Sequence, residues 1–222
     1  MNSSVVVPLV ASPVRRQRRS AVTRRRLLDA AEKVFGDAGF HAAAISQITH
    51  TAGMAQGTFY VHFTSKEELF TQLVADISRS LRHEMTRAAA NAPDRLAAER
   101  AGLIAFFDYT QRHPGLYRIV QEAQFVDPPS YRRYYERLAD GYARALAKAA
   151  EAGEIAPGDP AARAWALMGV GHFLGLYHCQ WQGTVPDAAT LDAAMDLIAH
   201  GLKGAPVAPK KTAAAKPRKV SK

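Results

Sequence analysis

The chain has 222 residues, of which 48% are hydrophobic, and it carries a formal net charge of +9. This length and apolar content allow a buried core and exclude a chain that is disordered throughout. The single cysteine, Cys179, excludes an intrachain disulfide and a cysteine-based zinc site, and it fits a reducing cytoplasm.

The positive charge is concentrated at the two ends of the chain. Residues 1–26 hold seven arginines and no acids, residues 203–222 hold seven lysines or arginines and no acids, and acids outnumber bases between them. Basic ends on an acidic body indicate contact with polyanions, although tails of this kind can also serve only solubility. We expect a disordered basic arm at residues 1–20 and a Lys-, Pro- and Ala-rich basic tail at residues 204–222.

The sequence also argues against secretion and against a membrane span. Its N-terminal apolar run is short, is interrupted by Pro8 and precedes the arginines, which is the reverse of a secretory signal. The longest apolar stretch, residues 164–179, is shorter than the ~20 residues that cross a bilayer and contains two histidines. We expect a soluble protein with no membrane contact.

The first predicted helix runs from Leu27 to Gly39, since apolar residues recur there every three or four positions. Short helices follow at residues 45–52 and 56–62, with Gly53 turning the chain between them. Ser65 and Glu68 are spaced as a reciprocal capping box that opens a long helix towards Ala90.

Proline and glycine breaks place further helices at about residues 95–112, 115–125, 131–152, 160–180 and 188–203. No segment alternates with a period of two residues, so the predicted fold is all-α. The helix at residues 160–180 is apolar on nearly all sides and rich in glycine, which predicts close packing in a four-helix dimer bundle with the last helix.

Residues 45–64 have the pattern of a helix-turn-helix, in which the second helix enters the major groove of DNA. Its apolar residues would lock the two helices together, leaving polar side chains outside. Hydroxyl, imidazole and ammonium groups donate hydrogen bonds to phosphate oxygens, and a helix N-terminus favours an anion. Each of these residues alone is more simply a core or surface residue, but their grouping favours DNA contact by Gln56, Thr58, Tyr60, Val61, His62 and Lys66.

The stretch "ISQITHTAGMAQGTFYVHFTSKEELF" resembles the DNA-binding domain of the tetracycline-repressor (TetR/AcrR) family, whose pattern is roughly "IA..AGVS.GT.Y.HF..KEEL". Ala55 stands where the family has a capping Ser, and Gln56 where it often has Lys. The resemblance implies a DNA-binding domain at residues 21–67 and a helical effector-binding and dimerisation domain at residues 68–203. It also implies that Thr58, Tyr60, His62 and Lys66 bind phosphates, and that Gln47, Gln56 and Val61 lie nearest the base edges.

The second half of the chain is rich in aromatic residues, which favours either an apolar ligand pocket or an ordinary core. A lipid-like or aromatic acid, or its coenzyme A thioester, would suit such a pocket with Arg112 and Arg118 nearby. The candidate pocket residues are Phe106, Tyr109, Tyr117, Phe125, Trp165, Phe173 and Tyr177.

The histidines and Cys179 do not have the spacing of metal ligands, so we expect no metal site, no cofactor and no catalytic residue. The sequence predicts a bacterial transcriptional regulator, a homodimeric repressor that binds a near-palindromic double-stranded DNA operator and is released by an apolar or aromatic small molecule. Its expected location is the cytoplasm, in association with the nucleoid. The alternatives are a DNA-coating nucleoid-type protein driven by the basic tails, and an enzyme or small-molecule carrier on a helical scaffold.

Overall fold

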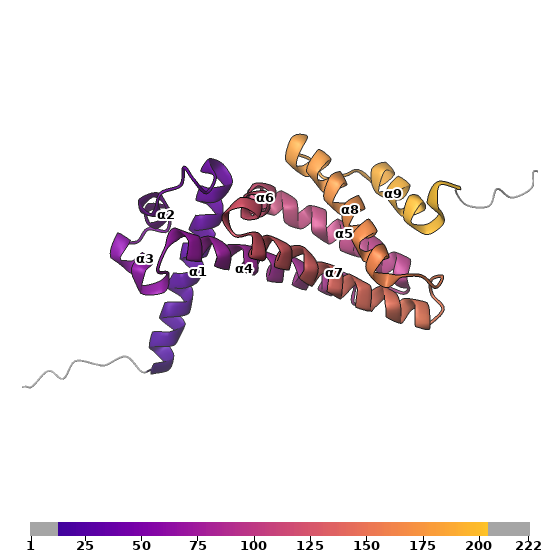
Figure 1. Cartoon of the computed structure of the whole chain (residues 1–222), viewed down its shortest axis with the longest axis horizontal. Helices are drawn as coiled ribbons and strands as arrows, with labels where there is room; N and C mark the ends of the chain where they lie inside the picture. The colour runs from indigo at the N-terminus through magenta and orange to yellow at the C-terminus, as the bar shows by residue number, and fades with distance from the viewer. Residues whose placement is uncertain (1–12, 204–222) are drawn as a thin grey trace, which may run out of the picture.

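The structure is a computed structural model that describes residues 13–203. Helices account for all the regular structure in this range, which confirms the all-α prediction (Figure 1). They are α1 (Pro13–Ala38), α2 (Ile45–Thr51), α3 (Gln56–His62), α4 (Lys66–Ala89), α5 (Arg95–Arg112), α6 (Leu116–Val126), α7 (Pro128–Glu151), α8 (Pro160–Gly175) and α9 (Ala188–His200), with a π-helical turn (Leu176–Trp181) after α8 and a 3-10 turn (Gly201–Lys203) after α9.

The first three helices and the start of α4 form a small unit at one end of the molecule (Figure 1). Phe70 of α4 meets Phe35 and Phe40 edge to face, with ring centroids 5.2 and 5.0 Å apart. Such edge-to-face pairs add to the gain from apolar burial. This aromatic cluster fixes α1 and the loop after it to α4.

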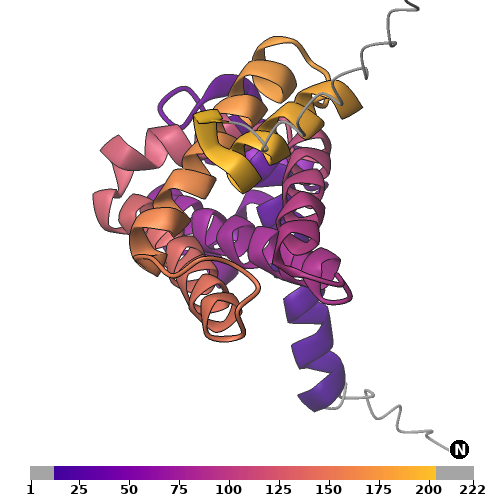
Figure 2. The same cartoon turned by 90° about the vertical axis from the view of Figure 1, so that its right-hand side faces the viewer.

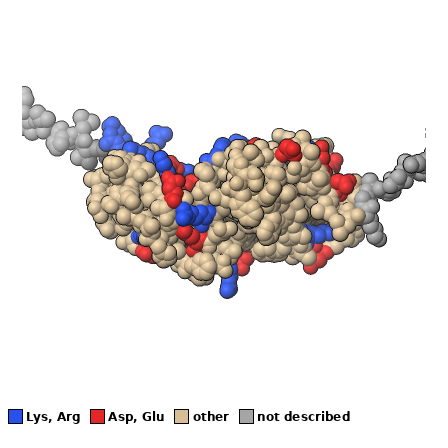
Figure 3. All heavy atoms as spheres, turned by 90° about the horizontal axis from the view of Figure 1, so that it is seen from above, with Lys and Arg blue, Asp and Glu red and all other residues tan. Residues whose placement is uncertain are grey.

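Helix α1 begins earlier than the sequence suggested, at Pro13. Residues 13–20 of the expected disordered arm are therefore helical, and only residues 1–12 of that arm, like the tail at residues 204–222, lie outside the described range. Pro13 suits the first turn of a helix, and the Arg, Gln and Ala residues that follow are good or acceptable helix formers. This basic part of α1 projects from the body of the molecule (Figure 2), and lysines and arginines gather at that end in Figure 3.

The start of α4 differs from the predicted reciprocal capping box in one bond. The Ser65 hydroxyl accepts the Glu68 amide at 3.1 Å, as expected. The Glu68 carboxylate, however, accepts from the amide and hydroxyl of Thr64, both at 2.7 Å, and not from Ser65. The two bonds from Thr64 lower the pKa of Glu68.

The larger unit consists of α4 to α9. Helix α4 packs along α5, α7 packs along α8, and α6 contacts α1, α4 and α7. The predicted helix at residues 160–180 ends as an α-helix at Gly175 and continues as the π-helical turn. Within residues 13–203, no helix has both the length and the apolar character needed to cross a membrane.

Candidate functional site

The turn between α2 and α3 is held by backbone and side-chain bonds. Gly53 adopts a φ of 63°, a region that favours glycine. The Met54 amide donates to the Thr49 carbonyl at 2.9 Å, and the Arg26 guanidinium of α1 donates to the Ala52 carbonyl at 2.7 Å. These bonds fix the angle between the two short helices.

Helix α3 buries Phe59 completely and turns its neighbours to solvent. Tyr60 is 57% exposed and Val61 77% exposed, and Gln56 is also exposed. Thr58 and His62 are half-buried. A firmly held helix that exposes an aromatic hydroxyl, a carboxamide and an apolar side chain has the shape and chemistry to enter a DNA groove. The surface of α3 therefore suits the predicted contact with DNA, and that contact stays a prediction.

Gln47 and Lys66 have partners inside the protein. The Gln47 carboxamide oxygen accepts the Ala44 amide at 2.8 Å and so caps α2, while its amino group keeps its donors. The Lys66 ammonium donates to the carbonyls of Phe40 at 2.7 Å and Ala43 at 2.9 Å. An ammonium has three donors, so Lys66 keeps one for a phosphate while it ties α4 to the loop after α1.

Helix α6 clamps the C-terminal end of α1. Arg118 donates to the carbonyls of Gly36 at 3.2 Å and Asp37 at 2.7 Å, and Glu122 accepts the Phe40 amide at 2.6 Å. The two helices cross at Gly36 and Gly115, where a Cβ on Gly115 would lie 2.7 Å from the Gly36 Cα. Only glycine allows this approach, which joins the small unit to the larger one.

The seven predicted pocket residues do not surround one pocket. Phe106 and Tyr117 are buried beside small cavities, and Tyr109 is buried and stacks on His113. Phe125 is 80% exposed. Trp165 lines a surface groove between α7 and α8, whereas Phe173 and Tyr177 line another between α8 and α9. Helical spacing alone could not show which aromatic faces which neighbour.

The two arginines predicted near the pocket are engaged elsewhere. Arg112 pairs with Glu84, and Arg118 binds α1 as described above. Among the residues 13–203, no three His, Cys, Asp or Glu side chains are grouped as metal ligands would be.

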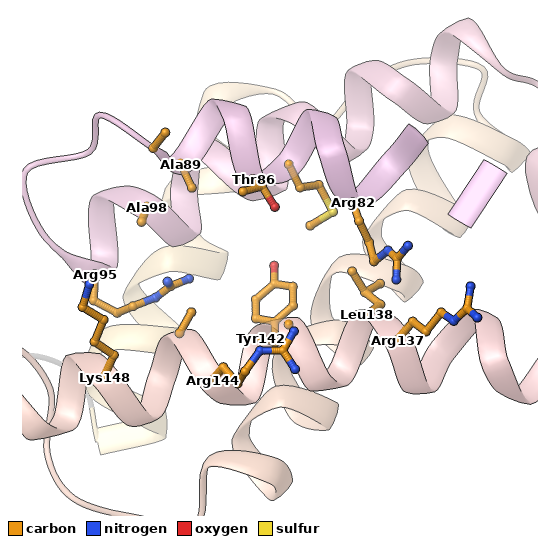
Figure 4. A pocket seen from close by; sticks show the side chains of 15 residues that line it. Arg82, Thr86, Ala89, Arg95, Ala98, Arg137, Leu138, Tyr142, Arg144 and Lys148 are labelled. Carbon is orange, nitrogen blue, oxygen red and sulfur yellow. The ribbon is translucent and has the colours of Figure 1, made fainter. Parts of the chain in front are cut away.

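A basic groove of about 660 Å³ lies between α4, α5 and α7. Figure 4 shows Arg82 and Arg137 near one end of it, Arg95 and Lys148 near the other, and Arg144 and Tyr142 between. Sequence reasoning missed these residues. A signal did exist, because Arg137, Arg144 and Lys148 are spaced by seven and four residues and therefore share one face of α7.

An apolar cavity of about 40 Å³ adjoins the groove and shares Met85, Leu138 and Tyr142 with it. Its other lining residues come from α5, α7 and α8, and burial lowers the pKa of His172 among them. Burial also raises the pKa of Tyr142, with the Glu99 carboxylate nearby as a further cause. The side chain of Tyr142 thus lies between the basic groove and the apolar cavity.

Residues 27–73 match the family model described as "Bacterial regulatory proteins, tetR family". The HTH-type transcriptional activator FasR of Mycolicibacterium smegmatis is 34% identical over 106 residues, 48% of each chain. The HTH-type transcriptional regulator YdgC of Bacillus subtilis is 43% identical over 60 residues, 27% of this chain and 31% of that one. The chain therefore spans about half or less of the length of these relatives.

Solved structures share the fold over a longer stretch. The fatty acid degradation regulator FadR from Bacillus halodurans superposes with a TM-score of 0.73 at 18% identity, over 82% of this chain and 97% of that one. The transcriptional regulator FadR from Bacillus subtilis, solved in complex with stearoyl-CoA, gives a TM-score of 0.67 at 17% identity, over 80% of this chain and 98% of that one.

Proposed function

We propose that this chain, a member of the TetR family by virtue of residues 27–73, is a dimeric transcriptional regulator that places α3 in the major groove of its operator. The observation that carries the proposal is the two-helix unit itself. Phe59 and the Arg26–Ala52 bond hold α3 rigidly, while Gln56, Tyr60 and Val61 face outward. A rigid unit with exposed polar and apolar side chains is what base reading requires.

The surface for the second copy is the apolar face of α8 and α9. Phe173 is 68% exposed, and Tyr177 and Leu197 are exposed beside it around a surface groove of about 580 Å³. Exposed apolar patches of this kind mark interaction sites. A two-fold pair joined there would present two recognition helices to half-sites about 34 Å apart, as a near-palindromic operator requires.

We further propose that the regulator is a repressor that acts in the cytoplasm, and that a small-molecule effector bound in the larger unit releases it from DNA. The Tyr117 hydroxyl of α6 donates to the His172 carbonyl of α8 at 2.8 Å, and α6 in turn clamps α1. A ligand that shifts α8 would therefore reach the DNA-binding unit through α6 as well as along α4. The stearoyl-CoA bound by the B. subtilis FadR supports an effector with an acyl tail and a phosphate-bearing head.

The proposal is tested by a footprint of the full chain on DNA that flanks its own gene, at about 150 mM salt so that nonspecific contacts are weakened. We expect two protected half-sites. Joint replacement Tyr60→Ala and His62→Ala should weaken protection at least about tenfold, because two phosphate donors are lost. The control is His83→Ala, an exposed histidine on α4, which should leave the footprint unchanged.

Diffuse protection of any DNA would contradict the regulator and favour the DNA-coating alternative. An unchanged footprint in the double variant would show that α3 does not read the operator. Transcription from the bound promoter decides the direction of control, since the relative FasR carries the name of an activator.

A further inference from the structure

We infer that the basic beginning of α1 binds the phosphate backbone of DNA beyond the outer edge of each half-site. We call residues 13–22 of α1 the basic extension, since they precede the part of the helix that packs into the small unit. This inference rests on the proposed function, because it needs an operator and a dimer. It adds a second contact with DNA, outside the major groove that α3 is proposed to enter.

The first argument is the contrast between the arginines at the two ends of this stretch. Where α1 meets the body of the molecule, Arg25 pairs with Asp76 at 2.6 Å and Arg26 donates to the Ala52 carbonyl at 2.7 Å. Three arginines of the basic extension are instead exposed and have no carboxylate within 4 Å in the part of the chain that the structure describes, and these are Arg15, Arg18 and Arg19. Their guanidinium groups are therefore available to phosphates, which they bind through several donors at once.

The second argument is the repulsion among these charges. Residues 13–28 contain no acid, so no carboxylate of this stretch offsets the arginines. Arg15 lies three residues before Arg18 and four before Arg19, and like charges at these spacings destabilise a helix. A row of phosphates beside the helix would relieve the repulsion and stabilise the basic extension as a helix.

The spacing of the residues shows which side of the basic extension would meet DNA. Residues 15, 19, 22 and 26 are separated by four, three and four positions, so they lie in one row along α1. At the inner end of this row, Arg26 contacts the carbonyl of Ala52, directly before the turn that leads into α3. The row therefore runs outward from the helix-turn-helix, and a duplex that α3 enters lies on the side of α1 that carries it.

The direction of the basic extension assigns it to the outer flank of each half-site. In Figures 1 and 2 the beginning of α1 projects from the side of the molecule opposite α9. Since two copies are proposed to join through α8 and α9, each extension would point away from the partner. The helix between residues 15 and 26 is about 16 Å long, at about 1.5 Å per residue. This length matches roughly five phosphates of one strand, which follow one another every ~3.4 Å along the duplex.

Binding of the full chain to two operator duplexes tests the inference, once the footprint has located the half-sites. The short duplex ends at the outer edges of the half-sites, and the long duplex continues on each side for about ten base pairs, one turn of DNA. We expect the long duplex to bind at least about tenfold more tightly at about 150 mM salt, because only this duplex offers phosphates to the basic extension. Equal affinity for the two duplexes would overturn the inference.

A triple variant shows whether the basic extension causes this preference. Joint replacement Arg15→Gln, Arg18→Gln and Arg19→Gln removes three charges and keeps residues that favour a helix. This variant should bind the two duplexes equally. On the long duplex, the slope of log affinity against log salt should become shallower by about 2–3 for each subunit, since each lost phosphate contact changes it by about 0.9. A preference for the long duplex that survives in the variant would overturn the inference.

The control removes the same charge elsewhere on the molecule. Joint replacement Lys33→Gln, Arg87→Gln and Arg132→Gln changes three exposed cations outside the basic extension. This control should keep both the preference for the long duplex and the salt slope of the unchanged chain. Loss of the preference in the control as well would mean that net charge, and not the basic extension, causes it, which would also overturn the inference.

The sequence of the flanks separates contact with phosphates from reading of bases. Contact with phosphates predicts the same affinity for long duplexes with A·T-rich and with G·C-rich flanks. The minor groove distinguishes these two kinds of base pair. A difference of about tenfold or more that disappears in the triple variant would overturn the phosphate contact and place the basic extension in the minor groove.

Hydrogen exchange gives a readout that does not depend on affinity. At saturating DNA, the amides of residues 15–22 should exchange at least about fivefold more slowly with the long duplex than with the short one, because contact stabilises this helix. Equal exchange would overturn the contact. Absence of a discrete footprint would refute the regulator itself, whereas a discrete footprint with equal affinity for the two duplexes refutes only this inference.

Discussion

The small unit, formed by α1–α3 and the start of α4, and the larger unit, formed by α4–α9, differ in how their interiors are packed. The small unit is packed shut around aromatic residues such as Phe35, Phe59 and Phe63, all of them at most 1% exposed, and it presents its polar side chains outward. The larger unit instead encloses a basic groove and an apolar cavity between helices. A surface that must match a rigid duplex gains from a rigid support, whereas a site that must change shape on binding needs space within it.

The largest expected effect on stability comes from creating a cavity in the core of the small unit. Phe59→Ala removes a fully buried ring and should lower the free energy of unfolding by about 3–5 kcal/mol, measured by urea denaturation. The matched control is Phe125→Ala, where the ring is 80% exposed and the change should stay within about 0.5 kcal/mol. Equal losses in the two variants would show that the small unit is not the tightly packed one.

The junction between the units comes next. Gly115→Ala would place a Cβ 2.7 Å from the Gly36 Cα and 3.3 Å from the Glu32 carbonyl, so α1 and α6 must separate. We expect a loss of about 1–3 kcal/mol in the free energy of unfolding. Gly169→Ala, with no atom near the added Cβ, should be neutral or slightly stabilising. A neutral Gly115→Ala would mean that the crossing is loose and that the units are not joined there.

The same contrast explains what the sequence could predict. The helix-turn-helix is local, since its buried residues, its glycine turn and its exposed side chains fall within about twenty consecutive residues of the chain, and a pattern match suffices. The basic groove combines Arg82 and Arg95 with three residues of α7 more than forty positions later. The spacing of residues 137, 144 and 148 shows a basic face, but only the packing of α7 against α4 and α5 shows that this face lines a recess.

The exposed aromatic residues make the same point from the other side. Phe125, Phe173 and Tyr177 are aromatic residues of the kind that line ligand pockets, and their positions in the sequence are compatible with a pocket. The structure exposes all three, since which face of a helix is covered depends on its neighbours. The early start of α1 at Pro13 was hidden for a related reason, because an exposed basic helix shows no apolar periodicity.

Lys66 offers a smaller test of the small unit, since its ammonium has a role inside the protein as well as a predicted role on DNA. Lys66→Met removes the bonds to the Phe40 and Ala43 carbonyls and should cost about 1 kcal/mol of stability. Operator affinity should fall as well. The control is Lys33→Met on the exposed face of α1, which should change stability by less than about 0.5 kcal/mol. Weaker operator binding without any loss of stability would assign Lys66 to DNA alone.

The smallest effect on stability is expected at the contact between α6 and α1. A change there should affect the release of the operator by an effector more than it affects stability. Glu122→Gln keeps an oxygen that can accept the Phe40 amide, now at 2.6 Å, but it removes the charge that strengthens this bond. Stability should fall by about 0.5–1 kcal/mol. Because the groove is untouched, stearoyl-CoA, used as a probe of the effector proposed above, should bind as before, yet release of the operator by that probe should be reduced.

The affinity for the probe and the release of the operator are measured on the same preparation, the first by calorimetry and the second by footprinting with added probe. Glu151→Gln, at the exposed end of α7 and far along the chain from the clamp, is the control that should change neither. If Glu122→Gln lowered probe affinity and left release intact, α6 would belong to the binding site. If Glu122→Gln changed neither probe affinity nor release, coupling between the small unit and the larger unit would run along α4, the helix that the two units share.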